Sequence, residues 1–133
     1  MEKDSPMNTA ILLAAGLMSV TVLVHVIMGG AQIMHPLRAA GLPRLIGAVM
    51  DVVWHGVTVV LICLAGALFW LAGALFWLAW HDNPALLWMT CAIQFGFAGL
   101  FLWYGTTQLH SLWPMPQWVI FLGVPALSLW GAA

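Results

Sequence analysis

Four long apolar segments fill most of this 133-residue chain, and they limit what it can fold into more than any other feature. Hydrophobic residues make up 64% of the chain and charged residues only 5%. A soluble domain carries about a quarter charged residues, because its surface must be wetted by water. Three basic and four acidic residues cannot cover a soluble fold of this length. We therefore expect an integral membrane protein.

The apolar segments are long enough to be membrane helices. A helix needs about 20 apolar residues to cross about 30 Å of hydrocarbon. Asn83 and Pro84 are typical of a helix start. Pro36 is expected to end the first helix. Pro125 is expected to kink the last helix and to free the carbonyl of Phe121. Short connections make successive helices antiparallel neighbours. We predict an all-α, antiparallel four-transmembrane-helix bundle in a single domain spanning residues 1–133, with helices over about 7–34, 45–80, 85–104 and 117–131.

The second predicted helix is too long for one simple crossing, and an internal repeat explains the excess. Residues 65–71 read AGALFWL, and residues 72–78 repeat that sequence. Seven residues make nearly two helical turns, so Gly66 and Gly73 should share a face. Small residues on one face favour close packing of membrane helices.

A few polar residues interrupt the apolar segments where such groups are costly, namely His25, Asp51, His55 and Gln94. Ionisable groups in membrane helices usually face the bundle interior and pair with one another. Counting from the connection between the first two helices places His25 and His55 at a similar depth. Helical spacing adds Met28, Gly29 and Gln32 to the face of His25, and Thr58 to the face of Asp51 and His55. We expect these groups to converge, with Asp51 pairing with one of the two histidines.

Three kinds of site fit these residues. The first is haem b held between His25 and His55, with Arg38 and Arg44 on the side where propionates would lie. The second is a transition-metal site with a mixed set of ligands, formed by His25, Met28, Asp51 and His55. The third is a proton or ion relay through the two histidines, Asp51 and Gln94.

Haem or metal binding in a redox or transport role is our first hypothesis, with Gln32, Thr58 and Gln94 as supporting polar groups. The alternative is an accessory or assembly subunit of a larger membrane complex that binds no ligand. In that case the polar groups only hold helices together.

Other features narrow the range of functions and partners. The sequence has no phosphate-binding loop, zinc-protease motif, GxSxG motif or haem-attachment CxxCH motif. We do not expect an enzyme, although a bound haem or metal could carry chemistry. A net charge of −1 gives no sign of nucleic-acid binding. The expected partners are the lipid bilayer and either a larger membrane complex or further copies of the chain.

Basic residues indicate the orientation. Arg38 and Arg44 lie between the first two helices, which places that connection in the cytoplasm and both termini outside.

The region around the first connection contains four short motifs: HVIMGG at 25–30, HPL at 35–37, LP at 42–43 and VWHGVT at 53–58. They resemble motifs of small, uncharacterised bacterial four-helix inner-membrane proteins. Those proteins carry a histidine-glycine motif on helix one and a Trp-His pair on helix two. The resemblance covers roughly residues 20–60. It implies a multi-pass protein of the bacterial inner (cytoplasmic) membrane with periplasmic termini, and no particular activity.

Overall fold

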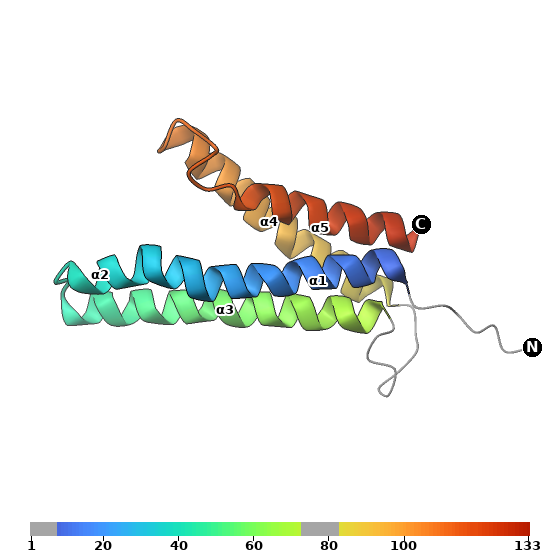
Figure 1. Cartoon of the computed structure of the whole chain (residues 1–133), viewed down its shortest axis with the longest axis horizontal. Helices are drawn as coiled ribbons and strands as arrows, with labels where there is room; N and C mark the ends of the chain where they lie inside the picture. The colour runs from blue at the N-terminus through green and yellow to red at the C-terminus, as the bar shows by residue number, and fades with distance from the viewer. Residues whose placement is uncertain (1–7, 73–82) are drawn as a thin grey trace, which may run out of the picture.

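The computed structural model describes residues 8–72 and 83–133, and this part of the chain is all-α, as predicted. Its elements follow one another as two helical hairpins (Figure 1). In chain order they are α1 (Thr9–Val24), the π-helix η1 (His25–Met34), α2 (His35–Ala39), α3 (Arg44–Leu71), α4 (Pro84–Thr107) and α5 (Gln117–Ala132). The first three form one continuous apolar helix of 31 residues, Thr9–Ala39.

Helix length and hydropathy make this a multi-pass membrane protein. In the described residues, three helices are long and apolar enough to cross a bilayer: Thr9–Ala39, Arg44–Leu71 and Pro84–Thr107. The fourth, α5, is apolar but has only 16 residues. At about 1.5 Å per residue it spans about 24 Å, less than the ~30 Å hydrocarbon core. The predicted four helices are thus confirmed over residues 8–72 and 83–133, and three of them are of spanning length.

The core lies at one end of the molecule, where the two hairpins meet. The α1–η1–α2 helix and α3 form one hairpin, and α4 and α5 form the other. The two hairpins diverge toward the α2–α3 and α4–α5 connections (Figure 1). Buried residues recur at helical spacing on α1 and α3 and are joined by side chains of α4 and α5. The main members are Ile11, Ala14, Ala15, Met18, Leu61, Leu64, Ala65, Leu68, Ala98, Phe121 and Val124.

Asn8 ties together three chain segments at the packed end. Its side chain accepts a hydrogen bond from the N–H of Ile11 and so caps α1. The same side chain donates to the carbonyl of Gly131 on α5, and its backbone N–H donates to the carbonyl of Ala72 after α3, at 3.1 Å. The starts and ends of three helices are therefore held by one residue.

The prediction that the first helix ends before Pro36 is wrong, since the helix continues to Ala39. A proline inside an α-helix lacks an N–H, and its ring clashes with the carbonyl four residues earlier. Here a π-helix precedes it, and the N–H of His35 bonds the carbonyl of Gly30, five residues back. The wider π turn moves the preceding carbonyls away from the proline ring, so the helix can continue.

The predicted second helix is described only to Leu71, followed by Ala72. The remainder of the 45–80 prediction, including Gly73 and most of the second repeat, lies outside the described residues. Within the first repeat, Gly66 does not pack against another described helix of this chain: it is exposed, and no described atom outside its own helix lies within 4 Å of a Cβ built there. Ala65 and Leu68 make the contacts instead. α5 runs through Pro125, which is buried.

Candidate functional site

One polar contact between helices joins His25 to α3. His25 is the first residue of η1 and is half-buried. Its ring stacks on the indole of Trp54, with centroids 4.1 Å apart and planes inclined by 18°. Its Nε2 lies 3.1 Å from Oγ1 of Thr58, one turn further along α3. We call His25, Gly29, Trp54 and Thr58 the His25 cluster.

The hydrogen bonds of Thr58 favour one tautomer of His25. The Thr58 hydroxyl has a single hydrogen, and its oxygen lies 3.1 Å from the carbonyl of Trp54, to which it can donate. With the hydrogen placed there, Thr58 accepts from His25, and Nε2 of the neutral ring is the donor. Nδ1 then carries the ring's lone pair. The contact with α3 thus orients the ring and favours this tautomer.

Gly29 leaves the space that the Trp54 ring occupies. A Cβ built on Gly29 would lie 2.7 Å from Cη2 of Trp54, closer than such atoms approach, whereas at Gly30 nothing lies within 4 Å. The glycine therefore lets the indole pass close to the backbone of η1. Sequence reasoning overlooked Trp54, because single tryptophans in membrane helices are common. The signal that could have found it is the four-residue spacing of Trp54 and Thr58 opposite His25 and Gly29.

The structure does not bring His25 and His55 together as expected. His25 contacts the side of α3 that carries Trp54 and Thr58, while the side chain of His55 is exposed. Successive residues project about 100° apart on an α-helix, so His55 leaves α3 in a different direction from its neighbour Trp54. A haem or metal held between these two histidines of one chain does not match this arrangement.

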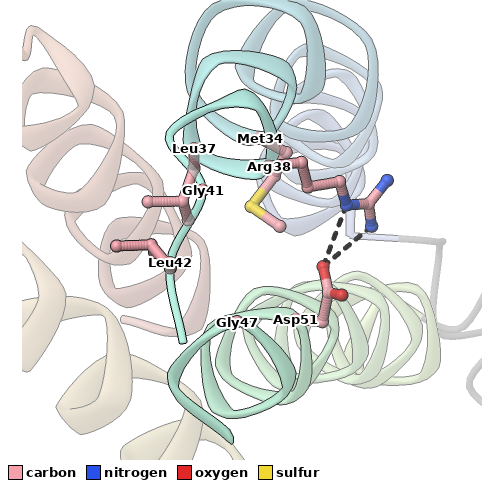
Figure 2. Close-up of a pocket in the computed structure, with 7 residues that line it drawn as sticks. All are labelled: Met34, Leu37, Arg38, Gly41, Leu42, Gly47 and Asp51. Carbon is pink, nitrogen blue, oxygen red and sulfur yellow. Dashed lines mark hydrogen bonds and ion pairs between the residues drawn. The ribbon is translucent and has the colours of Figure 1, made fainter. Parts of the chain in front are cut away.

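Asp51 pairs with an arginine rather than with a histidine. Its Oδ1 accepts from Nη2 of Arg38 at 2.8 Å and from Nε of Arg38 at 3.1 Å. Both side chains are largely exposed. The pair closes one side of a pocket of about 160 Å³ at the loop end of the first hairpin, as Figure 2 shows. The pocket is lined by Met34, Leu37, Arg38, Gly41, Leu42, Gly47 and Asp51. The ion pair links α2 to α3, and the expected Asp51–His contact is wrong.

The other residues of the proposed metal and haem sites are dispersed. Met28 and Gln32 are exposed, although the α-helical spacing predicted them beside His25. That spacing fails because a π-helix closes its bonds at the fifth residue, so each turn takes more than the roughly 3.6 residues of an α-helix. Arg44 is exposed at the start of α3. Among residues 8–72 and 83–133, no group of three or more His, Cys, Asp or Glu side chains could hold a metal ion.

Gln94 is buried, but it bonds within its own helix. It is 0% exposed on α4, and its Nε2 donates to the carbonyl of Thr90 at 3.1 Å. Its Oε1 has no hydrogen-bond partner in the described part of the chain. Asp51 bonds Arg38, and Gln94 bonds Thr90. These bonds do not connect either residue to the His25 cluster, so the described residues form no continuous relay.

Comparison with known proteins adds no relative to this picture. No protein family, curated protein or solved structure matches the chain.

Proposed function

We propose that this protein is a subunit of a larger membrane assembly, held there by the outer face of α3, which consists of the exposed residues Leu45, Ala48, Val52, His55, Val59, Ile62 and Gly66. This is the accessory or assembly role, and it requires no ligand. The observation that carries it is the exposure of His55, a polar side chain, on a helix of spanning length. A neighbouring protein would cover that side chain, since residues 8–72 and 83–133 of this chain leave it exposed.

Counting residues along α3 supports a position for His55 inside the hydrocarbon. α3 has 28 residues and so spans about 42 Å, about 12 Å more than the hydrocarbon core. His55 is about 16 Å from the Arg44 end of the helix. Even if the whole excess protrudes at that end, His55 still lies about 4 Å inside the core. Asp51, about 10 Å from the same end, can reach the headgroups.

An imidazole facing acyl chains has no hydrogen-bond partner for either nitrogen. Polar groups in membrane helices almost always face protein or a water-filled cavity for this reason. The side chain of His55 is also too short to reach the interface from this depth, as lysine and arginine do. Contact with another protein would satisfy the ring, and the surrounding apolar side chains would pack against that partner.

The membrane and the orientation belong to the same proposal. We place the protein in a bacterial inner membrane, with the α2–α3 connection in the cytoplasm and both termini in the periplasm. Support comes from Arg38 and Arg44 at that connection and from the resemblance described above. Exposed tryptophans near the helix ends, such as Trp88, Trp103, Trp113 and Trp130, suit the two interfaces.

Native mass spectrometry of the protein, extracted with its surrounding lipid in nanodiscs, tests the proposal. We expect a mass well above one chain of 14.5 kDa, and a smaller assembled fraction for His55→Leu. Val53→Leu, an apolar change at a neighbouring exposed position, should leave the assembly intact. A single chain in every sample would overturn the proposal.

Cofactor binding at His25 is the second candidate function, and one observation favours it. The bond to Thr58 leaves Nδ1 of His25 with a lone pair and fixes the ring, as an oxygen partner does for many metal-bound histidines. The ligand would be haem b or a transition metal. An absorption spectrum after haem-replete expression should show a haem band that His25→Ala abolishes, and metal analysis covers the other case. A colourless, metal-free sample would reject this function.

A further inference from the structure

We propose that the protein covering α3 is a second copy of this chain, packed in parallel so that the two His55 side chains hydrogen-bond to each other. This inference rests on the proposed function, because it names the partner that covers His55.

The outer face of α3 carries exposed residues at alternating spacings of three and four. These residues are Leu45, Ala48, Val52, His55, Val59, Ile62 and Gly66. This is the spacing at which two helices pack along a continuous seam with a left-handed crossing. The buried residues of α3, including Leu61, Leu64 and Leu68, point into the chain's own core. The seam is therefore available without unfolding any contact of the single chain.

Membrane topology determines how two such seams meet. Two copies inserted in the same bilayer have the same orientation, so a closed pair is related by a twofold axis along the membrane normal. In such a pair, each seam residue of one α3 faces its own equivalent on the other. His55 would thus face the partner's His55 at equal depth. Ala48 and Gly66 would let the two backbones approach closely, as small residues do at membrane interfaces.

Imidazole chemistry makes this arrangement self-complementary. A neutral histidine has one N–H donor and one nitrogen acceptor. One His55 can therefore donate to the partner's His55, and no second residue type is needed to satisfy the seam. Every other seam position is apolar or glycine, so a second copy supplies both the packing and the hydrogen bond.

The seam leaves the His25 cluster undisturbed. Trp54 and Thr58 contact η1 from another side of α3. α3 would thus take part in two histidine contacts. Within the chain it contacts His25, and its own His55 contacts the second copy.

Disulfide cross-linking of single-cysteine variants in the native membrane tests the inference. Cys63→Ser and Cys91→Ala first remove the natural thiols. Val52→Cys and Val59→Cys, both on the seam, should then give a covalent dimer on mild oxidation. Val53→Cys is the matched control, because Val52 and Val53 lie at nearly the same depth and are 71% and 55% exposed. Position 53 points about 100° away from position 52 and should not cross-link.

A second pair of variants tests the hydrogen bond itself. His55→Gln keeps a side chain that can bond its own equivalent, so the dimer should persist. His55→Leu should lower the association constant about threefold, the loss expected for one interhelical hydrogen bond in a membrane. Equal dimer fractions for these two variants would overturn the His55 pair.

The outcomes distinguish this inference from the proposed function. Equal cross-linking at positions 52 and 53 would overturn the proposal of a second copy. The proposal also fails if neither position 52 nor position 59 cross-links while circular dichroism shows a folded helix. If native masses then still show an assembly containing a different chain, the proposed function stands and this inference fails. A mass of one chain overturns both.

Discussion

At the scale of single residues, the contact between Gly29 and Trp54 gives the sharpest expectation. Gly29→Ala would place a methyl group 2.7 Å from the indole and force Trp54 off the ring of His25. Overpacking of this kind costs about 1–3 kcal/mol. Gly30→Ala, with nothing within 4 Å, is the control for the change in helix propensity. Thermal unfolding in detergent should rank Gly29→Ala below Gly30→Ala, and equal stability would mean that the indole does not contact Gly29.

The hydrogen bond between His25 and Thr58 makes a second residue-scale expectation. Nitrogen-15 NMR of histidine-labelled protein should show His25 protonated at Nε2, because the Thr58 hydroxyl accepts from the ring when it donates to the carbonyl of Trp54. Thr58→Val keeps the shape of the side chain but removes the hydroxyl. The His25 signal should then lose its single tautomer, and stability should fall by about 0.6 kcal/mol. A wild-type ring protonated at Nδ1 would contradict the assigned roles.

Sequence reasoning placed one polar neighbour of His25 and misassigned the partner of Asp51. Helical spacing placed Thr58 on the polar side of α3, and Thr58 does contact His25. Asp51 was assigned to a histidine because both appeared to lie deep in the membrane. An arginine four residues beyond Met34 reaches it instead, across the connection between the helices. The sequence could not show this, because the hairpin geometry decides which charged group is nearer.

At the scale of elements, two asparagine caps give a matched comparison. Asn8 caps α1 and also bonds Gly131 on α5, whereas Asn83 only caps α4, accepting from the N–H of Leu86 at 3.0 Å. Replacing a cap by alanine costs about 1 kcal/mol, and losing an additional hydrogen bond costs about 0.5–1.5 kcal/mol more. Unfolding by detergent titration should therefore show a larger loss for Asn8→Ala than for Asn83→Ala. Equal losses would mean that Asn8 does not tie α1 to α5.

Helix starts were more predictable than helix ends. The Asn83-Pro84 start of α4 is confirmed, because a capping side chain followed by proline is a local signal. The end of the first helix was misplaced, because the effect of Pro36 depends on the preceding turn. The ten-residue π-helix η1 was not anticipated, because the expected faces were counted at α-helical spacing. It also moved Met28 and Gln32 away from the face expected for them.

At the scale of the whole molecule, composition and segment length were sufficient for the class and the four helices. They could not show that the hairpins pack at one end and diverge at the other (Figure 1). That divergence leaves most residues of η1 and the first half of α3 exposed. The expected convergence of polar groups from three helices therefore does not occur. His25 contacts α3, Gln94 hydrogen-bonds within its own helix, and His55 is exposed.

The central claim is that protein, rather than lipid, covers the outer face of α3 in the membrane. Oxygen accessibility of spin labels at Val52→Cys and Val53→Cys, measured in bilayers, tests it most directly. In the isolated chain Val52 is the more exposed of the two, 71% against 55%. If protein covers the face that carries His55, the order inverts and the label at position 52 becomes the less accessible to oxygen. Higher accessibility at position 52 than at position 53 would show that lipid contacts this face and would contradict the account.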